Sequence, residues 1–109
     1  MFSRVVEIRC KAGKKDEVAT LIKEKLLPIL KPLRGFQDEL VLASKTDPKR
    51  VLALSFWAGQ EDAEQYQRER FPEIADALRP LCEGEPVVST FDVSLCTFVH
   101  SIDLRGKAA

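Results

Sequence analysis

The segment that most constrains the fold is the extended run from Val51 to Trp57, which has no face suited to water. A strand that is apolar on both alternating sets of side chains has to be covered on both sides. A chain of 109 residues has few elements with which to cover both faces of its own sheet. We therefore expect the second cover to come from another subunit, which predicts a homodimer with an enclosed cavity.

The composition is that of an ordinary globular protein, and we expect residues 1–109 to form one domain. Apolar residues make up 45% of the chain, and its 17 basic and 17 acidic residues cancel. Nucleic-acid binding usually needs a basic surface, which this balance does not supply. No apolar run reaches the roughly 18 residues of a membrane span, and the N-terminus lacks a signal-peptide pattern. We expect a cytoplasmic protein with no nucleic-acid partner and no membrane partner.

The three cysteines, Cys10, Cys82 and Cys96, are far apart in the sequence and show no C-x-x-C spacing. This pattern predicts neither a disulfide framework nor a metal site. We interpret all three as small buried apolar residues. The alternative is a reactive thiol, but His100 is the one imidazole near any of them, and neighbouring strand residues point to opposite faces.

Periodicity predicts the element order strand, helix, strand, strand, helix, strand. Pro28 should kink the first helix, and Asp47 with Pro48 favours a turn between the second and third strands. The second helical region should break at Phe71 and Pro72. The elements are expected over residues 3–10, 14–33, 36–46, 51–58, 60–81 and 87–102, followed by a frayed tail over 103–109.

A strand-helix-strand unit repeated twice in this order predicts a ferredoxin-like split βαβ fold of the α+β class. Such a fold has one antiparallel sheet with both helices on one face. The other face would then expose apolar side chains of the third and last strands to water. Burial of apolar surface is favourable by about 25 cal/mol per Å², so two sheets packed face to face would be stabilised. The expected assembly is a dimeric α+β barrel.

Three segments carry a resemblance to a known family. They are the strand opening Val5 to Gly13, the Arg34-Gly35-Phe36 turn, and Ser55 to Trp57 followed by the helix with Tyr66. In this order and spacing they resemble the antibiotic biosynthesis monooxygenase domain of the dimeric α+β barrel superfamily, over about residues 3–99. The resemblance implies a ferredoxin-like protomer, a homodimer whose sheets form a barrel, and a small-molecule cavity between sheet and helices.

The superfamily includes cofactor-free oxygenases of aromatic phenols and quinols, haem-degrading enzymes, isomerases and many proteins with no assigned activity. Haem-degrading members place a Trp at the position of Tyr66, a proximal His at Asp76 and an Asn at Val5. Without an imidazole at the proximal position, iron lacks a protein ligand of the usual type. The resemblance therefore implies a protein with no haem, and we expect no cofactor and no metal.

A cofactor-free oxygenase needs a base for its phenol-like substrate, a cation or donors for the resulting anion, and a dry pocket. Arg9 and Glu7 lie on the first-strand face that alternates away from Val6, and could place these charges inside the barrel. With Tyr66 they are the candidate catalytic residues. The alternative for this pair is a buried structural network that includes Asp92.

The candidate substrate-binding residues are Trp57, Ser55 and Asp92. Trp57 could form a flat wall for an aromatic ligand, and the alternative is a place in the core. Tyr66 could point its hydroxyl group at the substrate or cap the sheet edge. His100 is the only histidine, and its place near the end of the last strand favours solvent or the dimer interface.

Two functions stay open at this point. The first is a cofactor-independent monooxygenase of a small aromatic or quinol-like compound. The second is a non-catalytic dimeric barrel that binds a small apolar metabolite or serves as an assembly module. A polar pair facing an enclosed cavity would favour the first, and a cavity filled by side chains would favour the second. Phosphate-binding glycine loops and the G-x-S-x-G and H-E-x-x-H motifs are absent from the sequence, which excludes nucleotide, hydrolase and zinc-protease chemistry.

Overall fold

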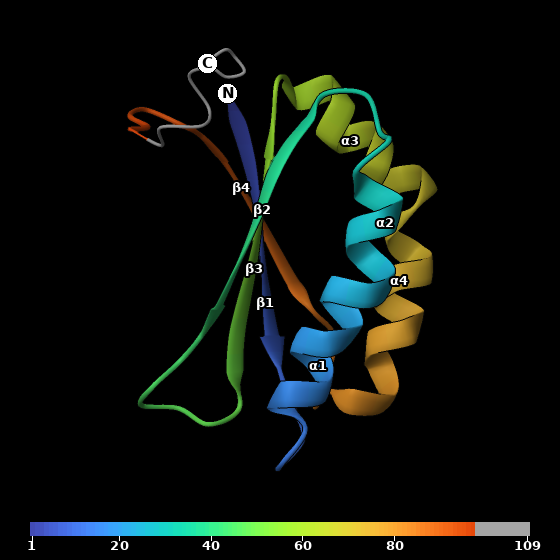
Figure 1. Cartoon of the computed structure of the whole chain (residues 1–109), viewed down its shortest axis with the longest axis vertical. Coiled ribbons are helices and arrows are strands. Elements are labelled where there is room, and N and C mark those ends of the chain that lie inside the picture. The colour runs from blue at the N-terminus through green and yellow to red at the C-terminus, as the bar shows by residue number, and fades with distance from the viewer. Residues whose placement is uncertain (98–109) are drawn as a thin grey trace.

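The structure of the protein is a computed structural model that describes residues 1–97. An antiparallel sheet of order β2-β3-β1-β4 carries the helices on one face (Figure 1). This arrangement confirms the predicted ferredoxin-like α+β fold. The elements are β1 Phe2–Arg9, α1 Lys15–Leu21, η1 Ile22–Leu26, α2 Leu27–Leu30, β2 Phe36–Ala43, β3 Arg50–Trp57, α3 Gln60–Glu69, α4 Phe71–Leu78, η2 Arg79–Leu81 and β4 Val87–Asp92.

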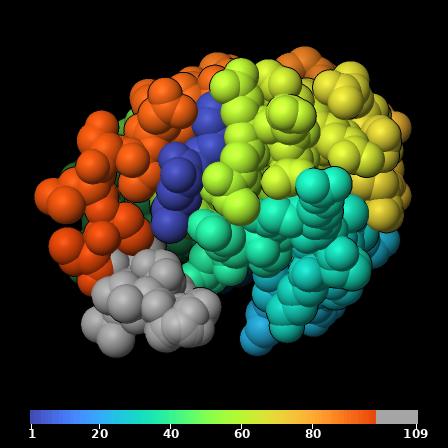
Figure 2. All heavy atoms as spheres, turned by 90° about the horizontal axis from the view of Figure 1, so that it is seen from above, coloured from blue at the N-terminus to red at the C-terminus, as the bar shows by residue number. Residues whose placement is uncertain are grey.

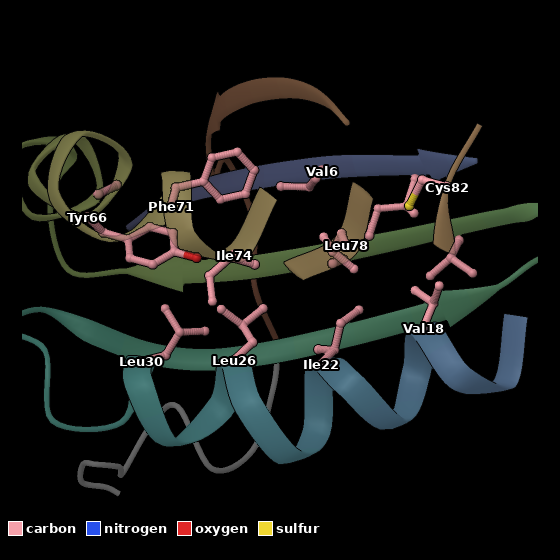
Figure 3. Packing of buried hydrophobic residues seen from close by; sticks show 14 of the residues in the cluster. Val6, Val18, Ile22, Leu26, Leu30, Tyr66, Phe71, Ile74, Leu78 and Cys82 are labelled. Atoms are coloured by element: carbon pink, nitrogen blue, oxygen red, sulfur yellow. The ribbon is translucent and has the colours of Figure 1, made fainter. Parts of the chain in front are cut away.

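The first helix is continuous from α1 through η1 to α2 and buries a single stripe of side chains. Its buried residues recur every four positions and point toward α4 and the sheet (Figure 3). They are Val18, Ile22, Leu26 and Leu30. The segment η1 is a π-helical turn directly before Pro28. Proline lacks the N–H that an α-helix needs at this position, so the predicted distortion takes the form of a wider turn.

The second helical region breaks where the sequence predicts. Helix α3 ends at Glu69, and α4 begins at Phe71 with Pro72 in its first turn. The N–H of Arg70 still donates to the Tyr66 carbonyl over 2.9 Å, so the two helices follow each other without a loop. This break allows Tyr66 on α3 and Phe71 on α4 to face the same part of the core.

The β2–β3 hairpin has the predicted turn. The N–H of Arg50 donates to the carbonyl of Asp47 over 3.2 Å, and Ser44 Oγ accepts from the N–H of Asp47 over 3.0 Å. Because Ser44 satisfies the loop backbone, β2 ends at Ala43 rather than at residue 46.

The last strand, β4, is shorter than predicted. It ends at Asp92, opposite Phe2, and one further backbone bond runs from the N–H of Val93 to the Met1 carbonyl over 2.9 Å. The chain over residues 93–97 is irregular. Figure 2 shows the start of β1 between β4 and the segment that joins β3 to α3. The predictions for residues 98–102, the tail over 103–109 and His100 lie outside the described residues.

The sheet face away from the helices is largely apolar and exposed. Leu40 is 39% exposed, Leu42 45%, Phe91 54% and Val87 62%. By strand register, all four point to the same side as Leu54 of β3. We call this side the open face. An exposed apolar surface of this extent is typical of an interface.

Cys10 and Cys82 face each other where the chain leaves β1 and η2. They form an isolated antiparallel bridge, and Cys10 is fully buried while Cys82 is 6% exposed. The flanking backbone bonds run from Lys11 N–H to the Leu81 carbonyl and from Glu83 N–H to the Arg9 carbonyl. The cysteines are therefore a non-hydrogen-bonded pair, in which the Cα atoms come closest. Both are buried as predicted, whereas Cys96 is only partly buried.

Gly35 closes the loop between α2 and β2 under tight steric limits. Its φ is +83°, and a Cβ atom there would lie 2.1 Å from Oδ2 of Asp62. The Gly35 carbonyl also accepts the N–H of Ala58 over 2.7 Å. Glycine is thus required both by the left-handed backbone and by the contact with α3.

Candidate functional site

A row of polar side chains crosses the helix-facing side of the sheet. Arg4 of β1 is paired with Ser55 of β3, and Ser55 is paired with Glu39 of β2. On its other side, Arg4 is paired with Thr90 of β4. On β1, β2 and β3 the flanking rows carry the apolar residues Phe2, Val6, Val41, Ala53 and Trp57, and Asp92 of β4 ends the Phe2 row. One polar row inside an apolar layer marks a position where the sequence places charge in the core.

The polar row lines an interior cavity closed by the helices. The cavity has a volume of about 20 Å³ and is bordered by Arg4, Ser55, Glu39, Tyr66 and Ile22 among others. This volume is sufficient for about one water molecule. The side chains of the first helix and of α4 close the space from the side opposite the sheet (Figure 3).

Arg4 places a cation in this enclosed site. It is 3% exposed, and its guanidinium carbon lies 5.0 Å from the ring centre of Tyr66 and 4.8 Å from that of Phe71. Its Nη2 donates to Oε1 of Gln67 on α3. Within residues 1–97, Arg4 forms no ion pair at 4.0 Å or less. Burial lowers the pKa of Arg4, but guanidinium groups stay charged in proteins.

Glu39 supplies a carboxyl group at the other end of the row. Its Oε1 atom is buried and has no hydrogen-bond partner among the described residues. Burial raises the pKa of Glu39 to about 8, an effect that the charge of Arg4 opposes and that of Asp38 reinforces. Buried polar atoms nearly always have a partner, so this oxygen is free to bind a water molecule or a ligand.

Tyr66 contributes a neutral phenol to the same cavity. Its hydroxyl group points inward, toward Ile74 (Figure 3). Burial raises the pKa of Tyr66 well above its usual range. Tyr66 is therefore a neutral phenol at neutral pH, able to donate a hydrogen bond, and does not act as a base.

Trp57 belongs to the core. It is fully buried, its Nε1 donates to Ser55 Oγ over 2.9 Å, and its ring stacks on Tyr66 with centres 5.4 Å apart. A third ring between the two would need about 7 Å, twice the contact distance of carbon atoms. Of the predicted site residues, the structure thus brings Tyr66 and Ser55 together at the cavity, with Trp57 behind them.

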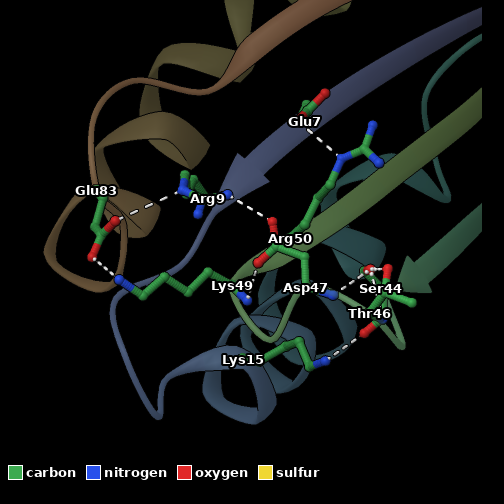
Figure 4. A network of polar contacts seen from close by, with 9 residues as sticks. All are labelled: Glu7, Arg9, Lys15, Ser44, Thr46, Asp47, Lys49, Arg50 and Glu83. Carbon is green, nitrogen blue, oxygen red and sulfur yellow. Dashed lines mark hydrogen bonds and ion pairs between the residues drawn. The ribbon is translucent and has the colours of Figure 1, made fainter.

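Glu7 and Arg9 lie on the open face, on the side of the sheet opposite the cavity. Arg9 Nη1 pairs with Oδ2 of Asp47 at 2.9 Å and its Nε lies 3.9 Å from Glu83, while Glu7 Oε2 pairs with Nε of Arg50 at 3.0 Å (Figure 4). These side chains are half-exposed in one chain, so they do not form the buried network considered from the sequence. The structure does not bring them to Tyr66.

Asp92 lies away from the interior cavity and from the ion pairs of Glu7 and Arg9. It is exposed at the end of β4, opposite Phe2, the first residue of β1. Arg9 is the last residue of β1 and pairs there with Asp47. The expected network of Asp92 with Arg9 is therefore not formed.

The sequence contains a signal for Arg4 that the initial interpretation missed. In β1 the helix-facing positions are Phe2, Arg4, Val6 and Ile8, and a charge in such an apolar set indicates a site or a buried ion. Glu39 is harder to find. The strand register shifts between Phe36 and Asp38, so simple alternation from Phe36 assigns Glu39 to the wrong side.

A groove leads from the surface toward this site. It lies between the first helix and β2 and has a volume of about 540 Å³. Lys23, Leu27 and Lys31 line its helix side, and Ile22 and Glu39 line both the groove and the interior cavity. Glu39 therefore stands at the boundary between the two spaces.

A family model described as antibiotic biosynthesis monooxygenase matches residues 1–86. The chain belongs to the antibiotic biosynthesis monooxygenase family. This confirms the resemblance seen in the sequence. At the level of the family, the protein is monooxygenase-like. No curated protein sequence shows a significant match to this chain.

Solved structures of low sequence identity share the fold. The monooxygenase ActVA-Orf6 of Streptomyces coelicolor, in complex with nanaomycin D, has a TM-score of 0.76 at 18% identity, covering 89% of this chain and 90% of its own. A variant of SnoaB, a cofactor-independent oxygenase from Streptomyces nogalater, has a TM-score of 0.73 at 14% identity, with coverage of 87% and 94%. A variant of MhuD with two manganese protoporphyrin IX bound per active site has a TM-score of 0.74 at 16% identity, with coverage of 90% and 99%.

Asp76 does not supply a haem ligand of the usual type. Asp76, at the position where haem-degrading relatives were expected to carry a histidine, is exposed and binds Nη1 of Arg79 at 2.5 Å. In the part of the chain that the structure describes, no cluster of three or more His, Cys, Asp or Glu is placed to hold a metal ion.

Over the same residues, 1–97, no helix combines the length and apolar character needed to cross a membrane.

Proposed function

We propose that the protein is a cofactor-independent monooxygenase of a small aromatic or quinol-like compound. The observation that carries this proposal is Arg4, a buried cation without an ion-pair partner among residues 1–97, set against the rings of Tyr66 and Phe71. In a water-poor site, a fixed cation stabilises a phenolate strongly relative to the neutral phenol. The anion is the form of the substrate that reacts with oxygen.

The reaction balances without an external reductant. For an anthrone-type substrate, the CH₂ group and O₂ give a C=O group and one water molecule. The substrate is oxidised and supplies all of the electrons that reduce oxygen. The chain has to bind the substrate, favour its anion through Arg4, orient it through the Tyr66 hydroxyl group and exclude water.

We also propose that the active form is a homodimer. The open face of one chain exposes Leu42, Phe91 and Val87, and a second copy would cover it. The interface should bury at least about 1,200 Å² in total and be mostly apolar. In such a dimer, Glu7 and Arg9 would face the space between the two sheets. A catalytic role for these two residues in that space is a separate hypothesis.

A second candidate function is a non-catalytic barrel that binds a small apolar metabolite or acts as an assembly module. The cavity volume of about 20 Å³ favours this function, because side chains fill the space beneath the helices. The two functions differ in whether the protein consumes oxygen. Oxygen uptake across a panel of phenols, quinols and anthrones therefore separates them.

The test uses Arg4→Met, which removes the charge and keeps much of the volume. Turnover should fall by a factor of about 10² or more, the scale reported for losing a single anion-stabilising donor. Arg68→Met, an exposed change on α3, is the control. Arg9→Met tests the open-face alternative in parallel. Unchanged turnover in Arg4→Met would remove Arg4 from the mechanism, and no uptake by the wild type would favour the non-catalytic barrel.

A further inference from the structure

We propose that the groove between the first helix and β2 is the substrate-binding site, and that Glu39 at its inner end is the base that removes the substrate proton. This inference rests on the proposed function for the substrate class, a phenol, quinol or anthrone. Within the space between sheet and helices that the family resemblance implies, it adds one groove of this chain and a catalytic residue.

The size of the two spaces places the ligand in the groove. The interior cavity holds about one water molecule, whereas the groove has about 540 Å³, within the usual range for small-molecule sites. Leu27 and Phe36 give the groove apolar surface on both walls. Lys23 and Lys31 stand on its helix side. The groove thus suits a flat apolar ligand that carries an oxygen substituent.

Glu39 is in the correct position to meet such a ligand. It borders both groove and cavity, and its Oε1 atom has no hydrogen-bond partner among the described residues. The polar row leads from Glu39 through Ser55 to Arg4, two strand spacings or about 10 Å away. A ligand deprotonated at Glu39 therefore develops its negative charge in the groove, beside Lys23 and Lys31, with Arg4 at the far end of the polar row.

The proton-transfer step conserves charge and electrons. Oε1 of ionised Glu39 takes a proton from the substrate O–H or C–H group, and the bonding pair stays on the substrate as phenolate or enolate. Glu39 becomes neutral, and its proton returns to solvent through the groove. The charge moves from a carboxylate whose Oε1 has no hydrogen-bond partner among the described residues to an anion in the groove, beside Lys23 and Lys31 and within the field of Arg4.

Burial makes Glu39 a strong base, although most of the charged groups around it are cations, which oppose this effect. Arg4 faces it from β1, Asp38 from its own strand, Tyr66 from α3, and Lys23 and Lys31 line the groove from the first helix. Burial raises the pKa of Glu39 to about 8, so the ionised form is a stronger base than an ordinary carboxylate. The value of kcat/KM should therefore rise with pH and reach half of its maximum near pH 8.

The decisive experiment measures proton removal without oxygen. Anthrone is incubated anaerobically with the protein in D₂O, and NMR follows deuterium exchange at its CH₂ group. Wild type should accelerate this exchange, and Glu39→Gln should reduce the acceleration by a factor of 10² or more, the usual range for a general base. Anthrone affinity should change less than threefold. Glu64→Gln, an exposed carboxylate on α3, is the matched control.

The outcomes separate this inference from the proposed function. Exchange by wild type that persists in Glu39→Gln would overturn the role of Glu39, as would a wild type that does not accelerate exchange at all. Exchange that depends on Glu39 without oxygen uptake under air would support Glu39 as a base and reject the oxygenase.

A second variant tests the groove itself. Leu27 is half-buried on the groove wall, and Leu27→Trp fills the groove without altering the polar row. Anthrone binding, followed by ligand fluorescence, should weaken at least tenfold. Circular dichroism checks that the variant is folded. Unchanged affinity in a folded variant would place the ligand elsewhere.

Discussion

Glu39→Gln should stabilise the protein, and the gain should grow with pH. In the folded chain, burial raises the pKa of Glu39 from 4.5 to about 8. The folded state therefore holds a proton that the unfolded state releases. The stability associated with neutral Glu39 is fully present below pH 4.5 and is lost as pH rises to about 8. Glutamine has nearly the same shape and does not titrate, so it removes this dependence.

The size of the effect follows from the shift in pKa. One pKa unit corresponds to about 1.4 kcal/mol, so the full shift amounts to roughly 5 kcal/mol once both states are ionised. At pH 7 the unfolded state is ionised and the folded state is mostly neutral, which gives a difference of about 3 kcal/mol. The total stability of a small protein is typically about 5–15 kcal/mol, so a change of this size is easily measured.

The assay is urea denaturation of wild type and Glu39→Gln at one protein concentration, at pH 5, 7 and 8.5. The free-energy difference between the two should rise by several kcal/mol from the first pH to the last. The comparison cancels other titrating groups, because both proteins share them. A difference that stays flat across this range would show that Glu39 is not buried as a neutral acid, and would remove the physical basis for its role as a strong base.

Three further results are expected from other parts of the molecule. Gly35→Ala should lower the free energy of unfolding by about 2 kcal/mol or more in urea, because alanine is strained at positive φ and its Cβ would clash with Asp62. Sedimentation should show a dimer at micromolar concentration, and Leu54→Asp on the open face should shift it to monomer; a stable wild-type monomer would contradict the proposed assembly. Diamide, which takes two electrons and two protons from a dithiol, should join Cys10 and Cys82, since Cα atoms of non-hydrogen-bonded pairs lie about 4.5 Å apart; peptide mapping that finds no such link would refute this.

The sequence was sufficient to predict the fold, because each element carried its own local signal. The buried stripe of the first helix, the break at Pro72 and the turn at Asp47 all appear where the pattern indicates. The end of β4 was not predictable from the same signals. Apolar alternation continues past Asp92, but a strand can only pair as far as its neighbour reaches, and β1 begins at Phe2.

The candidate site was predicted only in part, because a site depends on which face of each strand meets the helices. Tyr66, chosen from its place on the helix, borders the interior cavity. Glu7 and Arg9 were chosen as the charged face of β1, yet the helices cover the other face, where Arg4 is the exception in an apolar series. Glu39 depended on a register shift in β2 that no residue pattern announces.

For the proposed cofactor-free oxygenase, we expect the helix side of the sheet to carry the chemistry and the open face to carry the dimer interface. On the helix side, Arg4 and Glu39 are held in one row, far enough apart that they do not neutralise each other as an ion pair. For a substrate in the groove, Glu39 therefore remains available as a base, and Arg4 acts on the anion from the far end of the row. On the open face, apolar side chains offer a surface to a second copy. Dimer formation would fix the curvature of the sheet, and with it the distance between the two ends of the row. In the proposed dimer, assembly and chemistry would therefore be connected through the same four strands, and a variant that separates the subunits should also reduce proton removal at Glu39.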